Sequence, residues 1–498
     1  MKVVSRVEDE NQTKDHSPEH NSYIHMKKFK FIMLIFVLIF ATSGVTLLAL
    51  SLGGESPANV IIQERKEFNK LYQAYDELDK NYFEEVNSED LINGAIDGMV
   101  NALGDPYSDY MTQEENDQFE ESITSSFEGI GAEIQEREGN IVVVSPIKDS
   151  PAEKAGIQPN DKIIKVDDKN IQGMSSNEAV LLIRGKKGSK VDLTILRGEK
   201  DNEIKLTLTR DEIPINTVYA EMLDDGVAKI QITSFSQHTN EELEEALNEM
   251  NDKGMNSLII DLRRNPGGLL DQAISLSELF VPKGQKIVQV EDRNGAMEET
   301  IAQTADKIDV PTVMLIDEGS ASASEILAAA ASETANIPLI GVDSFGKGTV
   351  QTQKKFSDGS NVKYTIAKWL TPNGNWIHDE GIKPDYEVKL PEYANLPYIS
   401  PDDEWKVSST SEEVKAAEEM LKVLGYDPGK VDGFFDDKTK KAIEKFQKDE
   451  KLKTTGVLSG DTTVKLMTNL SEHLVKEDPQ VKKAVEVLMK DKQKKKAS

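Results

Sequence analysis

The sequence has no cysteine, few histidines and a shortage of basic residues. Without cysteine, the chain can form no disulfides, thiolate metal sites or thiol nucleophiles. It has 59 lysines and arginines against 88 aspartates and glutamates, a formal net charge of −29. A surface of this sign repels nucleic acid, so we expect no nucleic-acid partner. Its 498 residues exceed what one hydrophobic core organises, and several folded units are expected.

One long apolar run interrupts this polar background. Residues 31–50 read FIMLIFVLIFATSGVTLLAL, and their length matches the roughly 20 residues that cross a bilayer as a helix. Three lysines at 27–30 precede the run and no comparable basic cluster follows it, so the positive-inside rule predicts a cytoplasmic tail at 1–29. We interpret 30–52 as an uncleaved anchor of a single-pass cell-membrane protein. The alternative is a cleaved signal peptide and a secreted protein.

The pattern of apolar residues and turn residues divides the rest of the chain. It predicts a multidomain α/β protein, because strands and helices alternate through its largest part. The predicted parts are a helical region at 60–117, a β-rich domain at 118–209, an α/β core at 210–395, a linker at 396–412, a small helical domain at 413–468 and a C-terminal tail at 469–498.

The segment GSASASEILAAA (319–330) places three serines where a strand gives way to a helix. A serine at such a turn is exposed, and the N–H of the next residue is free to hold an oxyanion. The same letters fit an ordinary helix start, because Ser322 and Glu325 have the spacing of a capping box. The motif alone leaves a catalytic and a structural interpretation open.

A nucleophilic serine needs a base, and only His238 and His378 fall within the α/β region. A lysine can act instead if burial lowers its pKa well below about 10.4, because the ammonium form cannot accept a proton. Lys347 lies between two glycines in SFGKGTVQ, with no charged neighbour between Asp343 and Lys354. This segment predicts a buried lysine base.

The segment around Lys347 also has the G-x-x-x-x-G-K spacing of a phosphate-binding loop. Gly348 stands where that loop needs Ser or Thr, and the residues that follow alternate like a strand rather than opening a helix. Nucleotide binding is therefore rejected. A further loop, RRNPGG (263–268), is either a simple Pro-Gly turn or a place where a backbone N–H approaches a reacting carbonyl.

Together these segments resemble the carboxyl-terminal processing proteases, serine peptidases related to the tail-specific protease of bacteria, over about residues 65–390. The resemblance implies a crotonase/ClpP-like core that works without a metal or cofactor. The site residues that it implies are the nucleophile Ser322, the base Lys347, the lysine-orienting Gln351, and the oxyanion donors Ala323 and either Gly267 or Gly268.

Members of this family carry an inserted PDZ domain, and residues 118–209 resemble one. In FEGIGAEI, the backbone of Gly129, Ile130 and Gly131 would bind a substrate's free C-terminus while a strand pairs alongside. The resemblance gives Arg184, in LLIRGKKG, two roles, a carboxylate anchor or a latch to the core, and it could equally be a solvated charge.

Residues 413–468 resemble a second family, the small helical peptidoglycan-binding module. The matching stretch, LKVLGYDPGKVDGFFDDKTKKAIEKFQ, contains the characteristic DGF and FQ pairs, residues that also serve packing and turn formation. The second half is a looser match, because Val464 stands where relatives often have an aromatic residue. This resemblance implies peptidoglycan as a partner.

We therefore expect a membrane-tethered serine endopeptidase whose PDZ domain delivers unstructured C-terminal tails of extracytoplasmic proteins for cleavage. The family resemblance also implies that the N-terminal helices can pair two protomers. Two other functions stay open: an adaptor of the same fold that delivers partners without cutting them, and a Ser–His enzyme that uses His378.

Overall fold

A computed structural model of the chain describes residues 65–497 except 138, 199–201 and 306. The predicted anchor and cytoplasmic tail lie outside these residues. Within the described part, no helix combines the length and apolar character that a membrane span requires. The chain forms two compact units that divide after Ile92.

The described part of the first unit is mainly one helix. The short η1 (Lys66–Phe68) leads into α2 (Asn69–Asn81), and no residue of α2 is buried. Leu71, Tyr72 and Leu78 are among its exposed apolar side chains. The next helix, α3 (Ser88–Asn101), begins in this unit and continues into the second.

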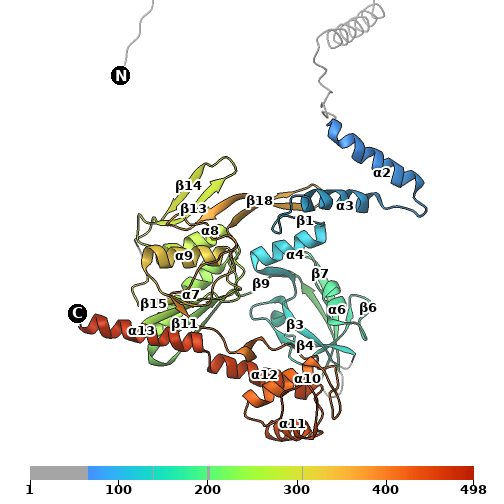
Figure 1. The fold of residues 1–498 in the computed structure, drawn as a ribbon. Coiled ribbons are helices and arrows are strands. Elements are labelled where there is room, and N and C mark those ends of the chain that lie inside the picture. The colour runs from blue at the N-terminus through green and yellow to red at the C-terminus, as the bar shows by residue number, and fades with distance from the viewer. Residues whose placement is uncertain (1–64, 138, 199–201, 306, 498) are drawn as a thin grey trace, which may run out of the picture. The chain divides into compact units, whose positions relative to one another are not determined.

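The second unit contains a six-stranded sheet of order β10-β11-β12-β15-β16-β19 (Figure 1). Its strands are β10 (Val218–Met222), β11 (Val227–Ile232), β12 (Ser257–Asp261), β15 (Thr312–Ile316), β16 (Leu339–Gly341) and β19 (Tyr386–Glu387). From β11 onward neighbouring strands are parallel. Helices α7 (Thr239–Asp252), α8 (Leu270–Glu278) and α9 (Ala323–Ala335) lie between these strands in the sequence, which is the predicted α/β alternation.

Both faces of this sheet are covered, because successive side chains of a strand point to opposite faces. On one face, alternate residues such as Ile230 and Ile260 join the core formed with α7, α8 and α9. On the other face, residues such as Ile259 and Leu315 pack against α13 (Pro479–Ala497). Figure 1 shows α13 lying along the strands of this sheet.

The C-terminal tail predicted at 469–498 is therefore wrong. Helix α12 (Asp461–Lys476) occupies its first part, and α13 buries Ala484, Val487 and Leu488 against the sheet. The tail was predicted from the lysines, which lie on the polar face of α13. The apolar residues of the same helix form a stripe that packs on the sheet.

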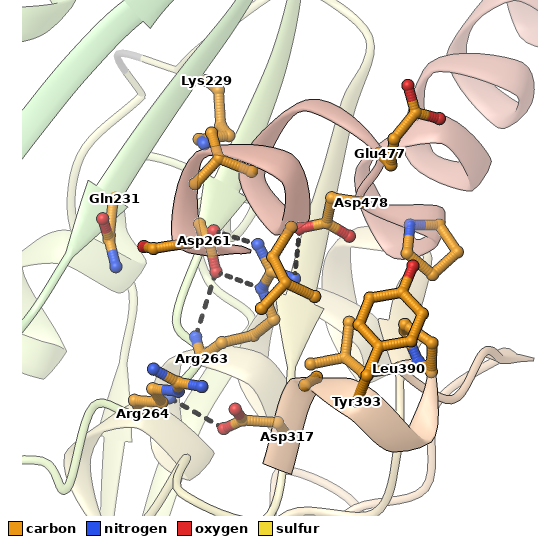
Figure 2. A pocket seen from close by; sticks show the side chains of 16 residues that line it. Lys229, Gln231, Asp261, Arg263, Arg264, Asp317, Leu390, Tyr393, Glu477 and Asp478 are labelled. Carbon is orange, nitrogen blue, oxygen red and sulfur yellow. Dashed lines mark hydrogen bonds and ion pairs between the residues drawn. The ribbon is translucent and has the colours of Figure 1, made fainter. Parts of the chain in front are cut away.

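The polar link between α13 and the core lies in a pocket of about 230 Å³ behind the RRNPGG loop (Figure 2). The guanidinium of Arg263 donates to both carboxylate oxygens of Asp261, at 2.8 and 2.7 Å. Its remaining nitrogen donates to Asp478 Oδ2 and Gln480 Oε1, both at 2.7 Å. Asp478 also accepts the Gln480 and Val481 amides at the start of α13. The helix and the loop are thus joined through one arginine.

A second sheet carries the residues that follow the SFGKG turn. It runs β1-β18-β13-β14, with β17 also paired to β18. The strands are β1 (Asp109–Met111), β13 (Lys286–Asp292), β14 (Met297–Ile301), β17 (Thr349–Lys355) and β18 (Asn361–Leu370). Because β1 belongs to the segment before the β-rich domain, this sheet brings that segment to the α/β core.

The β-rich domain has its own core and its own sheet, β3-β4-β5-β7-β8, with β6 paired to β5. The elements are β3 (Ala132–Arg137), β4 (Asn140–Pro146), α5 (Pro151–Lys154), β5 (Lys162–Val166), β6 (Lys169–Asn170), α6 (Ser176–Ile183), β7 (Lys190–Arg197) and β8 (Asn202–Thr209). A pair formed by β2 (Ser126–Gly129) and β9 (Asp211–Pro214) frames the domain. The predicted boundary at 118 is too early, because α4 (Gln113–Thr124) is helical across it.

The small helical domain contains α10 (Glu412–Val423), α11 (Asp437–Asp449) and α12 around a shared core. The linker predicted at 396–412 is wrong as a free connection. Ile399 is fully buried in this core, and Trp405 exchanges backbone hydrogen bonds with Leu458. Its apolar side chains, diluted among acidic residues and prolines, anchor the segment to the domain.

Candidate active site

The three serines of the 319–330 motif have different environments. Ser320 and Ser324 are fully buried, and their hydroxyls donate to backbone carbonyls, Leu262 O at 2.8 Å and Asn265 O at 2.9 Å. Both carbonyls border or lie in the RRNPGG loop. Ser322 stands at the start of α9 and lines a cavity. Its φ of 54° and ψ of −112° put it in a strained conformation of the kind that clusters at functional sites.

A buried carboxylate, Glu325, joins the serine turn to the lysine turn. Its Oε2 accepts the backbone N–H of Ser322 at 2.7 Å and that of Lys347 at 2.9 Å. Its Oε1 accepts the Ser344 hydroxyl at 2.6 Å and the Gly346 N–H at 2.7 Å. The sequence indicated Glu325 only as a helix cap. A fully buried glutamate is unusual, and its burial indicates a larger role.

The lysine turn is held on both sides. The carbonyl of Lys347 accepts the indole N–H of the buried Trp369 at 2.8 Å, while its N–H is bound by Glu325. Gly348 is required at its position, because a Cβ there would lie 2.8 Å from the Trp376 indole nitrogen and 2.9 Å from His378 N. The backbone of Lys347 therefore has one defined place.

The amine of Lys347 lies 4.9 Å from the centre of the Tyr107 ring. Burial lowers the pKa of this amine below its usual value, and the nearby positive charge of Lys363 lowers it further, while Asp105 and Glu325 act in the opposite direction. The net direction is the one that a lysine base requires, because only the neutral amine can accept a proton. The contact of Tyr107 with this lysine was not foreseen from the sequence.

Ser322 and Lys347 line the same cavity of about 400 Å³. Gln351 lines it too, with its amide donating to Thr349 Oγ1 at 2.9 Å and Thr365 Oγ1 at 3.2 Å. The rest of the lining is largely apolar and includes Phe119, Ile123, Leu269, Leu270, Ile326, Val350 and Trp369. The cavity can therefore accept an extended peptide with apolar side chains.

The predicted oxyanion donors meet at the edge of this cavity. Ala323 is the first residue of α9, so its N–H has no partner within the helix. The N–H of Gly267 donates to Asn265 Oδ1 at 2.9 Å. Gly268 lines the cavity, and its N–H makes no hydrogen bond to any described residue. A Cβ on Gly267 would lie 2.9 Å from Ala323 N, so only glycine permits this approach.

Comparisons with known proteins show the family of the chain. Residues 226–388 match the model of peptidase family S41, and residues 53–115 match that of the activating protease CtpB N-terminal domain. The chain is 48% identical to the carboxy-terminal processing protease CtpA of Bacillus subtilis, over 93% of the chain and 99% of that protein. The chain belongs to the carboxy-terminal processing proteases. It is a serine-type peptidase.

Other relatives of this processing protease align over most of its length. CtpB of Bacillus subtilis is 43% identical over 80% of the chain and 83% of that protein. A CtpA-like serine protease of Staphylococcus epidermidis is 38% identical over 94% of the chain and 95% of that protein. Within the chain, residues 129–208 match a PDZ domain and residues 410–466 a peptidoglycan binding domain, as the two resemblances implied.

In the PDZ domain of the processing protease, the predicted carboxylate-binding residues begin with Gly129, the last residue of β2. Ile130 is buried, and its carbonyl accepts the Ala152 N–H at 2.8 Å. Gly131 has a φ of 72°, and a Cβ there would lie 2.4 Å from Ser150 Cβ. The conformation of this loop therefore depends on glycine.

Arg184 of the PDZ domain contacts the segment that precedes that domain. Its guanidinium forms an ion pair with Glu121 of α4 at 2.7 Å and lies 4.8 Å from the centre of the Phe127 ring. These contacts join Arg184 to α4 and β2, and neither partner belongs to the α/β core.

The positions of the two histidines in the α/β region of the processing protease do not favour a Ser–His pair. His378 stacks on Trp376 with ring centres 5.1 Å apart, and its Nδ1 accepts the Gly348 N–H at 3.3 Å. No histidine is among the described residues that line the cavity of Ser322. His238 pairs with Glu241 at an exposed position.

Proposed function

We propose that the protease cleaves extracytoplasmic proteins near their C-termini, with Ser322 as nucleophile and Lys347 as general base. One observation carries this proposal: both residues line one cavity, and one buried carboxylate binds both of their backbone amides. Positioning of this kind converts a weak nucleophile and its base into a reactive pair.

The reaction proceeds in two halves. The neutral amine of Lys347 takes the proton of the Ser322 hydroxyl as Oγ attacks the scissile carbonyl carbon. The N–H groups of Ala323 and Gly268 hold the resulting oxyanion, since the Gly267 N–H is engaged by Asn265. The C–N bond then breaks, and the lysine ammonium returns its proton to the leaving amine. Water, deprotonated by Lys347, hydrolyses the acyl-enzyme.

Gln351 lies in the same cavity and orients the lysine side chain. Its amide nitrogen donates to two threonine hydroxyls, and the amide oxygen of the same side chain is the acceptor that would hold the lysine. Substrate tails enter through the PDZ domain, whose loop at Gly129, Ile130 and Gly131 binds the terminal carboxylate.

Two segments of the chain support a location of the protease at the membrane and the cell wall. The apolar segment at 31–50 anchors it in the membrane, and the peptidoglycan-binding domain holds it near the wall. The exposed apolar side chains of α2 support pairing of two protomers through their N-terminal helices.

Cleavage assays on the full-length protein in detergent test this function. We expect the wild type to cut casein and a peptide with a free C-terminus, and Ser322→Ala and Lys347→Ala to lose at least about 10³-fold in kcat/KM. Lys355→Ala, which removes a lysine from β17 outside the cavity, is the matched control. Equal cleavage in all four proteins would contradict the assignment of Ser322 and Lys347, and no cleavage by any of them would support the adaptor function instead. Activity that survives Lys347→Ala but is lost in His378→Ala would establish a Ser–His enzyme.

A peptide pair tests PDZ delivery separately. A substrate with an amidated C-terminus should show a higher KM than the same peptide with a free carboxylate, because the carboxylate-binding loop loses its ligand. Equal KM values would remove the PDZ domain from substrate delivery while leaving the catalytic assignment intact.

A further inference from the structure

The cavity that holds Ser322 has an unusual balance of charge. Two of the residues that line it are charged, and both are lysines, Lys347 and Lys363. No aspartate or glutamate is among the described lining residues, although the chain as a whole carries a net charge of −29. In so acidic a protein, a cavity whose charged lining residues are both lysines suggests that the second lysine, Lys363, has a function there.

Lys363 is fixed in place by the sheet and by an aromatic ring. It stands on β18 opposite Gln353 of β17, whose side chain lines the same cavity. Its ammonium lies 5.3 Å from the centre of the Phe119 ring of α4, within the range of a cation–π contact. This arrangement repeats that of Lys347 over Tyr107. Each lysine is thus directed by a ring from the segment before the PDZ domain.

The acidic groups around the two lysines have other partners. Asp105 accepts the Tyr107 N–H at 3.1 Å and the Ser108 hydroxyl at 2.6 Å. Glu325 binds the four donors described above, and Glu120 of α4 pairs with Lys355 at 3.7 Å. Asp109 stands opposite Lys363 in the β1–β18 ladder, but no carboxylate among the described residues lies within ion-pair distance of Lys363. The ring of His378 lies 6.0 Å from the Tyr107 ring, centre to centre.

We propose that Lys363 is a positioning residue of the catalytic site, whose positive charge keeps Lys347 in the neutral amine form that takes the Ser322 proton. This inference rests on the proposed function of Lys347. Two like charges in one cavity of low polarity repel, and protonation of Lys347 is therefore disfavoured. This repulsion and burial both lower the pKa of Lys347, whereas the negative charges of Asp105 and Glu325 raise it. Without Lys363, burial would be the only effect that opposes the two carboxylates. A second lysine in the cavity of the base, without a carboxylate partner among the described residues, meets this requirement.

The test is the pH dependence of kcat/KM for a neutral peptide, measured on full-length wild type, Lys363→Met and Lys363→Arg. Removal of the charge should move the acid limb of the profile to higher pH, so that at a pH on this limb kcat/KM falls roughly three- to tenfold. Near the plateau the two proteins should be alike, and Lys363→Arg should retain the wild-type limb. Lys355→Met controls for loss of one positive charge on the neighbouring strand.

A second measurement does not depend on turnover. In the inactive Ser322→Ala protein, the titration of selectively labelled Lys347, followed by the NMR signal of its Cε, should move to higher pH when Lys363 is replaced by Met. Lys363→Gln serves in both measurements should the Met variant fail to fold.

Three outcomes would overturn the inference or its foundation, and they are distinguishable. An unchanged acid limb with an active Lys363→Met protein would refute the role of Lys363 alone. A rise in KM confined to acidic substrates, with an unchanged limb, would make Lys363 a specificity residue instead. Full activity of Lys347→Ala would remove the base itself, and with it the proposed function.

Discussion

The Oε2 atom of Glu325 lies 2.7 Å from the amide nitrogen of Ser322 and accepts its hydrogen bond. The same oxygen accepts the Lys347 N–H, so the Ser322 turn and the Lys347 turn share one acceptor although Lys347 lies 22 residues after Glu325 in the chain. We interpret this carboxylate as the part that sets the distance between the two turns.

Replacement of Glu325 by Gln should impair catalysis more than folding. The amide NH₂ of glutamine cannot accept hydrogen bonds, so at least one of the two turns loses its partner. We expect kcat to fall on the order of 10²-fold and stability to fall by about 2–4 kcal/mol. Kinetics and chemical denaturation measure the two effects. Glu318→Gln, an exposed position in the turn before the motif, is the control, and wild-type kcat in Glu325→Gln would contradict the interpretation.

The lowered pKa of Lys347 has a consequence for stability. A lysine with a lowered pKa in the fold binds fewer protons there than in the unfolded chain between that pKa and its usual value, so stability rises with pH across this window. Lys347→Met removes the group. We therefore expect the wild type to gain stability relative to Lys347→Met as pH rises toward about 10.5, as measured by urea unfolding at several pH values. A constant difference between the two proteins would show that the fold does not perturb this lysine.

Gly267→Ala should disturb the nucleophile turn directly. The new Cβ would lie 2.7 Å from Ala321 O and 2.9 Å from both Ala323 N and Ser322 Cβ. We expect kcat to fall by about 10²-fold or more, because Ala323, the proposed oxyanion donor, is displaced. Gly295→Ala has a comparable φ of 80° but meets no atom within 4 Å, so it isolates the backbone strain. Equal losses in the two variants would mean that strain alone is responsible.

The ion pair between Arg184 and Glu121 should act as a coupled unit. Its side chains are about a third exposed, so we expect a coupling of about 0.5–1 kcal/mol in a double-mutant cycle on unfolding with Arg184→Ala and Glu121→Ala. A carboxylate anchor would behave differently. In that case Arg184→Ala would raise KM for free-carboxylate peptides and Glu121→Ala would not.

Asp478→Asn should weaken the attachment of α13 to the core. It removes a charged partner of Arg263, whose side chain is only 14% exposed, and we expect a loss of about 1–3 kcal/mol of stability. Thermal unfolding measures the effect. Glu477→Gln, an adjacent acidic residue whose pairing with Lys482 lies at the surface, should change stability little. Similar stability in both variants would show that Arg263 is satisfied by Asp261 alone.

Local features of the sequence were sufficient to predict the order of the domains and a candidate catalytic motif. The alternation of strands and helices follows from side-chain periodicity. The motifs at 319–330 and 344–351 are recognised by the order of their residues, which is specific enough to indicate a family. Lys347 could be selected because its neighbours are glycines without charge, a property of adjacent residues alone.

Tertiary structure decided what depends on distant contacts. Ser320 and Ser324 differ from Ser322 because their hydroxyls bind carbonyls nearly sixty residues away, which no local pattern reveals. Likewise, Glu325 resembles a helix cap until the lysine turn folds against it, and α13 resembles a charged tail until its apolar stripe meets the sheet. A hydrogen bond or a buried surface between remote segments exists only once folding has brought both partners together. For that reason the sequence indicated only a helix cap at Glu325 and a charged tail at α13.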